Sequence, residues 1–105
     1  MTAIPPVDFL ALSAILLGIG LFGILTRRNF ILLLISIEIA MNAAILNFVV
    51  FAAYSGTGGG IGGQAVAVVL VGLAATEVAV GLAIVLALNR VRGSINVAEA
   101  TTLRQ

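Results

Sequence analysis

The sequence predicts an all-α membrane protein with three transmembrane helices. Of its 105 residues, 62% are hydrophobic and 9% are charged, and the mean hydropathy is +1.29. Stretches without any charge run at about 9–26, 30–54 and 65–88. Soluble domains carry about 25% charged residues, so this chain cannot cover a surface that faces water. We therefore expect a single membrane domain over residues 1–105, in which these three ranges cross the bilayer.

Each of the three ranges meets the requirements of a membrane-spanning helix. At about 1.5 Å per residue, each is long enough to cross hydrocarbon about 30 Å thick. Backbone groups in lipid must be hydrogen-bonded within the protein, which favours helices over strands. The first range is expected to be retained rather than cleaved as a signal peptide, because no Lys or Arg precedes Arg27. The pair Arg27–Arg28 follows a complete span, so it is not interpreted as a twin-arginine export signal.

The connecting segments predict the orientation in the membrane. Arg27 and Arg28 lie in the short turn after the first range, and further arginines lie in the tail 89–105. The Gly-rich loop 55–64 carries no charge. The positive-inside rule then places the arginine turn and the C-terminus in the cytoplasm, and the N-terminus and the loop outside.

No cofactor, metal or nucleic acid is expected to bind to this chain. Cys and His are absent, which excludes the usual zinc sites, iron–sulfur centres and His- or Cys-held haem. The loop segment 58–63 matches the G-x-G-x-x-G pattern of dinucleotide-binding turns, but that turn needs a preceding strand and a soluble helix after it. We interpret the loop as a flexible linker. A net charge of +1 gives no indication of nucleic-acid binding.

Two acidic residues, Glu38 and Glu77, are the only charged residues within the three ranges. A charge at the centre of a bilayer costs about 3 kcal/mol on insertion scales, so such a residue indicates a functional site. Counted from the helix ends at Phe30 and Leu88, the carboxyls lie about 12 Å and about 17 Å from the same membrane face. If the helices pack about 8–10 Å apart, one or two waters can connect the carboxyls. We predict that they relay protons; a purely structural hydrogen-bonding role is the alternative.

Other polar and small residues are assigned supporting roles. Asn42 lies one turn after Glu38 on the same face and is predicted to hold the carboxyl or a water. Ser36 and Asn47 fall on the opposite face and are expected to contact a different neighbour. Arg27 and Arg28 act as topology anchors or assist proton uptake, and both interpretations stay open. Small residues are expected to allow close packing on the first helix and to leave room for water near Glu77: Ala14, Gly18, Gly20, Gly23, Gly72, Ala74, Thr76 and Gly81.

The chain supplies relay groups at one depth only. A path across the membrane needs groups at several depths, so a relay through this chain has to run sideways to neighbouring polypeptides. We therefore expect the chain to be part of a larger assembly.

Three segments resemble a known family: Leu25–Asn29, Ser36–Ala43 and Leu73–Ile84. They are similar to the small K-type membrane subunit of proton-pumping NADH–quinone oxidoreductase, respiratory complex I, and the likeness extends over about residues 9–92. The resemblance implies that Glu38 and Glu77 lie in a hydrated polar axis that joins the quinone site to antiporter-like pumping subunits. It also implies that NADH, FMN, iron–sulfur clusters and quinone bind in other subunits, that this subunit catalyses nothing alone, and that it resides in the bacterial plasma membrane.

The same features also occur, in part, in other classes of membrane protein. Related small subunits occur in multi-subunit sodium/proton antiporters and in membrane-bound hydrogenases, and both remain alternative functions for this chain. A small drug/proton exporter typically has four spans, an aromatic pocket and a glutamate in its first helix, whereas this chain has no Trp and one Tyr. A rotor-ring subunit has two helices and one carboxyl. A structural scaffold without a relay role also remains an alternative.

Overall fold

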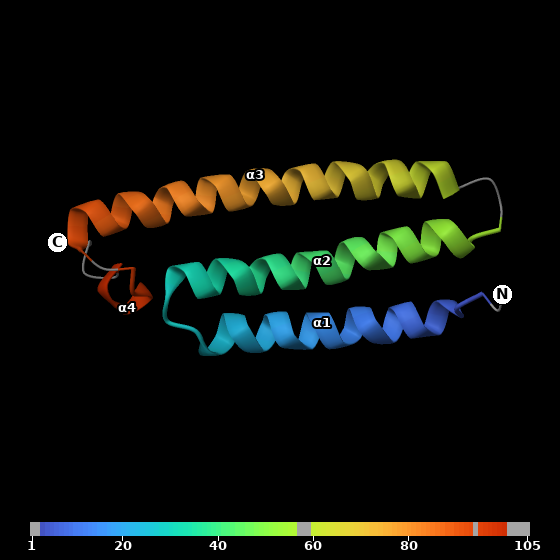
Figure 1. Cartoon of the computed structure of the whole chain (residues 1–105), viewed down its shortest axis with the longest axis horizontal. Coiled ribbons are helices and arrows are strands. Elements are labelled where there is room, and N and C mark those ends of the chain that lie inside the picture. The colour runs from blue at the N-terminus through green and yellow to red at the C-terminus, as the bar shows by residue number, and fades with distance from the viewer. Residues whose placement is uncertain (1–2, 57–59, 94, 101–105) are drawn as a thin grey trace.

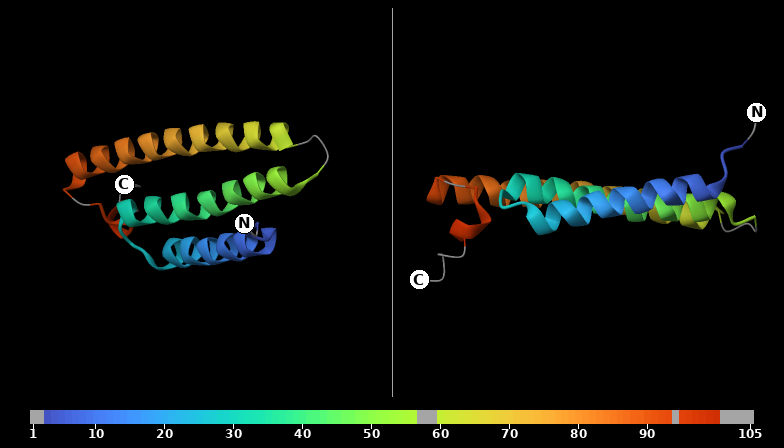
Figure 2. Two further views of the ribbon diagram at one scale, coloured as in Figure 1. Left: turned by 45° about the vertical axis from the view of Figure 1, so that its right-hand side comes forward. Right: turned by 90° about the horizontal axis from the view of Figure 1, so that it is seen from below.

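The computed structural model describes residues 3–56, 60–93 and 95–100. It contains three long helices, α1 (Pro6–Thr26), α2 (Phe30–Tyr54) and α3 (Gly60–Arg92), and a short helix α4 (Val97–Ala100). The long helices lie side by side with α2 in the middle (Figure 1), and from below they overlap in roughly one layer (Figure 2). All three are long and apolar enough to cross a membrane. The predicted three-helix fold is confirmed.

Local sequence explains where the first two helices begin. α1 has Pro6 in its first turn. Backbone N–H groups in a first turn have no acceptor within the helix, so a proline, which lacks the N–H, costs nothing there. α2 is capped by Asn29, whose Oδ1 accepts hydrogen bonds from the backbone N–H groups of Ile31 (2.9 Å) and Leu32 (3.3 Å). This cap satisfies two of the donors that a helix start leaves free.

The third helix is longer than the sequence predicted. Residues 60–64, expected in the outer loop, form its first turns, and residues 89–92, expected in the tail, form its last. Gly63 explains the early start, because it lets α3 approach α2 so closely that a Cβ there would lie 2.5 Å from the Cβ of Ala52. Packing of this kind overrides the low helix propensity of glycine. Residues 57–59 of the loop and Arg104 of the tail lie outside the described residues.

The tail returns to the start of α2 (Figure 1). The N–H of Phe30 donates to the carbonyl of Ile95 (3.0 Å), and the N–H of Val97 donates to the carbonyl of Arg28 (2.7 Å). These two bonds form an isolated antiparallel bridge between Asn29 and Asn96. The tail is therefore held against the α1–α2 turn at Ile95 and Val97, a contact that the sequence did not predict.

Two interfaces hold the long helices together. α1 meets α2 through small residues, since a Cβ on Gly20 would lie 2.7 Å from the backbone nitrogen of Ala40. Ser13 adds a buried hydrogen bond from its Oγ to the carbonyl of Ala43 (2.9 Å). α2 meets α3 through an apolar cluster of Met41, Ile45, Ala67, Leu70 and Ala74. The predicted close packing on α1 is confirmed at Gly20 and Gly23, but Gly18 has no atom within 4 Å of its Cβ position.

Candidate functional site

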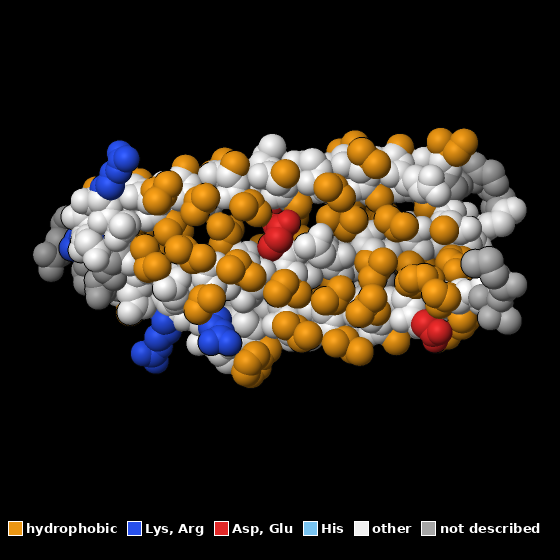
Figure 3. All heavy atoms as spheres, in the orientation of Figure 1, with side chains coloured by type: hydrophobic (Ala, Val, Ile, Leu, Met, Phe, Trp, Pro, Cys, Tyr) orange, Lys and Arg blue, Asp and Glu red, His pale blue; other side chains and the backbone are white. Residues whose placement is uncertain are grey.

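Glu38 lies in a groove between α2 and α3. Its side chain is partly buried and is the only charged group among the residues that line this space of about 270 Å³. The other lining residues are apolar: Ile31, Leu34, Ile35, Ile39, Val78 and Leu82. Figure 3 shows one acidic side chain surrounded by apolar side chains midway along the bundle. In apolar surroundings a carboxylate is costly unless water or a polar partner reaches it.

Glu77 lies at the same level as Glu38. α2 and α3 run antiparallel (Figure 1), and the Cβ position of Gly81 on α3 lies against the side chain of Leu34 on α2. Glu38 follows Leu34 by one helical turn, while Glu77 precedes Gly81 by one turn. Antiparallel register therefore brings both carboxyls to one depth in the bundle. Unlike Glu38, Glu77 is exposed on the surface of the chain.

The two carboxyls project to opposite sides of the α2–α3 interface. A second groove of about 170 Å³ flanks this interface and shares only Leu34 with the groove of Glu38. It is lined on α3 by Ile84, whereas the groove of Glu38 is lined by Leu82. These two residues project almost oppositely, because a helix turns about 100° per residue. Glu77 precedes Ile84 by two turns and shares its face.

Equal depth alone predicted a direct link of one or two waters between the carboxyls. Leu34 lines both grooves, but it lies one turn away from the level of the two glutamates. The link of one or two waters therefore stays a prediction, and the structure adds that the two residues lie on different flanks of the interface.

Asn42 is positioned beside Glu38 but does not bind it. Asn42 is exposed one turn further along α2, and no hydrogen bond joins the two side chains in the described part of the chain. Ser36 faces α1, as predicted, since a Cβ on Gly23 would meet its side chain. Asn47 lies about three turns beyond Ser36 on the same face. Its buried Oδ1 has no hydrogen-bond partner among the described residues.

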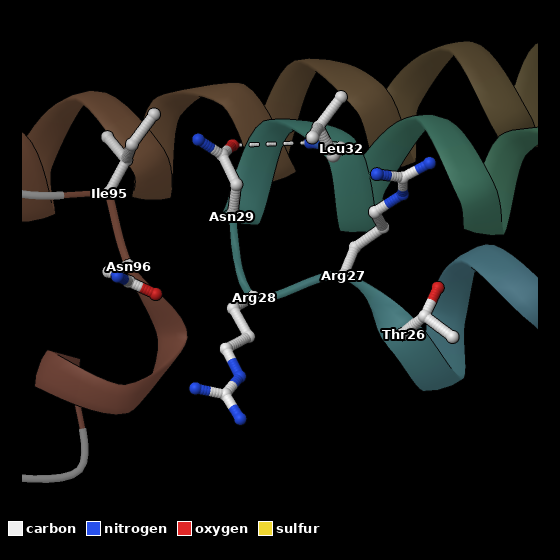
Figure 4. Close-up of a pocket in the computed structure, with 7 residues that line it drawn as sticks. All are labelled: Thr26, Arg27, Arg28, Asn29, Leu32, Ile95 and Asn96. Carbon is white, nitrogen blue, oxygen red and sulfur yellow. Dashed lines mark hydrogen bonds between the residues drawn. The ribbon is translucent and has the colours of Figure 1, made fainter.

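Arg27 and Arg28 line a pocket of about 400 Å³ at one end of the bundle (Figure 4). Its other walls are formed by residues of the same turn and by Ile95 and Asn96 of the returning tail. Figure 4 shows Arg27 extending along α2 and Arg28 extending away from it, past the tail. Neither guanidinium forms an ion pair within the described residues. No pattern in the sequence indicates the contribution of Ile95 and Asn96, because it depends on the tail folding back.

The described residues contain no group of three or more acids that could hold a metal ion. The arrangement offers instead two single carboxyls at one depth, each able to accept and release a proton toward a different neighbour.

Comparison with known proteins identifies close relatives. The model of the family described as NADH-ubiquinone/plastoquinone oxidoreductase chain 4L matches residues 8–105. A protein named NADH-quinone oxidoreductase subunit K from Anaeromyxobacter sp. (strain K) is 48% identical over 101 residues, which cover 95% of this chain and 99% of the relative. Proteins of the same name from Geobacillus sp. (strain WCH70) and Bacillus anthracis are 43% and 44% identical over 104 residues, covering 99% of each chain.

Proposed function

The chain belongs to the NADH-ubiquinone/plastoquinone oxidoreductase chain 4L family, and we propose that it passes protons sideways through the membrane arm of the complex by means of Glu38 and Glu77. As a subunit K it assembles with other subunits of NADH–quinone oxidoreductase. In this proposal quinone reduction in other subunits drives the transfer, and NADH, FMN, iron–sulfur clusters and quinone bind there. This chain contributes the relay groups and no redox chemistry of its own.

The observation that carries the proposal is the placement of the carboxyls. They share one depth in a bundle of three apolar helices and point to opposite flanks of the α2–α3 interface. A charged group in hydrocarbon is costly and indicates function. Two such groups at one depth cannot form a path across the membrane, but on opposite flanks they can accept a proton from one neighbouring subunit and deliver it to another.

The supporting residues fit the same proposal. Asn42 lies one turn from Glu38 and offers an amide that can bind a water beside the carboxyl. Arg27 and Arg28 lie at the end of α2 that is nearer to Glu38, where their charge attracts anionic groups or orders water at the entrance to the groove. We further propose that this end faces the cytoplasm of a bacterial plasma membrane and that the N-terminus lies outside, as the positive-inside rule predicts.

The test replaces each glutamate by glutamine in the assembled complex. Glutamine keeps the shape of glutamate but cannot exchange a proton. A positioned proton-transfer group contributes about 10²–10⁴-fold. We therefore expect proton pumping coupled to NADH oxidation to fall to about one-tenth or less in Glu38→Gln, with a smaller loss in Glu77→Gln. The number of protons moved per electron, measured in sealed membrane vesicles, is the decisive quantity.

Asp8→Asn is the matched control. It also removes one carboxyl, but Asp8 lies in the first turn of α1, away from the middle of the bundle. Its proton-to-electron ratio is expected to equal that of the wild type. A double Glu38→Gln, Glu77→Gln complex that assembles and pumps at the wild-type ratio would falsify the relay and leave the glutamates as structural groups.

A further inference from the structure

We propose that the pocket at the α1–α2 turn is a binding site for the phosphate group of an anionic phospholipid. We call one end of the bundle the basic end; it carries this turn and the last turn of α3. The described arginines at this end are Arg27, Arg28, Arg90 and Arg92. Figure 3 shows all visible basic side chains at that end. Such clustering makes the basic end attractive to anions of any kind.

The pocket itself concentrates unpaired cationic donors. Arg27 and Arg28 line it together, and in the described part of the chain neither has an acidic partner or a hydrogen-bond acceptor for its guanidinium. Each guanidinium presents five N–H donors in a planar fork that matches the oxygens of a phosphate. The side chains diverge in Figure 4, so Arg28 provides the first contact and Arg27 the second charge after rotation about its flexible stem.

The backbone N–H groups at the start of α2 are already hydrogen-bonded and offer an anion no second place to bind. The N–H groups of Phe30, Ile31 and Leu32 are already bonded to Ile95 and Asn29. The start of α2 therefore has few free donors for an anion, and recognition depends on the arginine side chains. The same bonds hold the tail against the turn, so the pocket keeps its shape before any ligand arrives.

Apolar side chains beside the pocket favour a lipid over a soluble anion. Leu25 and Phe22, in the last turns of α1, are 84% and 64% exposed, and Leu32 in the first turn of α2 is 43% exposed. Leu32 lines the pocket itself, and Leu25 and Phe22 precede Arg27 by two and five residues along α1. A phospholipid matches both features, with its phosphate at the arginines and its acyl chains against these side chains. Basic pockets at the ends of membrane helices bind anionic headgroups for this reason.

The test uses the purified complex that contains the full-length chain. The complex is depleted of loosely bound lipid in mild detergent and titrated with phosphatidylglycerol that carries a photoreactive group near the top of one acyl chain. Label on peptides of this subunit is quantified by mass spectrometry. We expect saturable labelling around Phe22, Leu25 and Leu32, and much weaker labelling with the equivalent zwitterionic phosphatidylcholine.

Variants separate the site from general surface charge. Each basic residue near the membrane surface contributes about 1 kcal/mol to binding an anionic lipid, so Arg27→Gln with Arg28→Gln should weaken labelling about 30-fold. The matched control, Arg90→Gln with Arg92→Gln, removes the same charge from the same end of the bundle on another helix. It is expected to change labelling less than about twofold, because neither Arg90 nor Arg92 lines the pocket and salt screens exposed charges that do not contact the ligand.

A charge-conserving variant covers the case in which the Gln pair fails to insert or assemble. Arg27→Lys with Arg28→Lys keeps the charge that orients the helices but loses the two-pronged guanidinium, and we expect labelling to weaken severalfold. Equal losses in the pocket and control variants would contradict the proposal, as would equal labelling by phosphatidylcholine. Competition by millimolar inorganic phosphate would identify a site for soluble phosphate instead. Absence of lipid label, together with a cross-link from Arg27 or Arg28 to a carboxylate of a neighbouring subunit, would identify a protein contact.

Discussion

The two helix interfaces of this protein differ in how tightly they are closed. Along α1–α2, small residues allow contact between the helix backbones, as at Gly20 and Ala40, and a buried hydrogen bond runs from Ser13 to Ala43. Along α2–α3, an apolar cluster is flanked by three grooves that contain residues of both helices. Glu38 lines one of the grooves of the open interface, and Glu77 lies on α3 at the same depth.

The difference separates structural from functional parts of the molecule. Without a hydrophobic driving force inside lipid, helices associate through close packing and hydrogen bonds. α1 and α2 use both, so together they form a stable unit. The α2–α3 interface gives up part of this packing, and the groove that Glu38 lines leaves room beside its carboxyl for water or for a side chain of a neighbouring subunit. If the α1–α2 interface contributes more to stability, a substitution there should lower the thermal midpoint more than the same substitution along α2–α3.

The largest effect on stability is expected from Gly20→Ala. The added methyl group would lie 2.7 Å from the backbone nitrogen of Ala40 and 2.9 Å from its Cα, and a backbone cannot move aside as a side chain can. Overpacking of this kind costs about 1–3 kcal/mol. We expect less assembled complex in membranes and a lower midpoint of thermal dissociation in detergent.

Gly18→Ala is the control for that experiment. It makes the same chemical change two residues earlier in α1, at a position with nothing within 4 Å. Alanine favours a helix over glycine by about 1 kcal/mol, so Gly18→Ala should leave the thermal midpoint unchanged or raise it. Equal damage from both variants would mean that α1 meets α2 through a different face.

A smaller loss is expected from Ser13→Ala at the same interface. Its Oγ donates to the carbonyl of Ala43 across the helices at 2.9 Å, and the side chain is buried. Hydrogen bonds between membrane helices contribute about 0.6 kcal/mol on average. Thermal dissociation of the complex should shift downward by a fraction of the Gly20→Ala shift. Ser13→Thr, which keeps the hydroxyl but adds a methyl group, distinguishes loss of the bond from loss of space.

Much of this comparison was predictable from sequence, but its decisive details were not. The three helices and the shared depth of Glu38 and Glu77 follow from uninterrupted apolar length and a fixed rise per residue. Helical periodicity shows which residues share a face, but not which neighbour that face meets. For this reason Gly18 was expected to pack as Gly20 does. The flank to which each glutamate points, and the tail that completes the arginine pocket, depend on contacts between distant segments.

The smallest effect is expected from Gly81→Ala at the open interface. Here the added methyl group would lie 2.7 Å from Cδ1 of Leu34, the end of a side chain that can adopt another rotamer. That adjustment costs about 0.5–1.5 kcal/mol, and the gain in helix propensity of about 1 kcal/mol offsets it. We expect a thermal midpoint close to that of the wild type. A loss as large as that of Gly20→Ala would show that Leu34 has no free space beside it and that the α2–α3 interface is as closed as its counterpart.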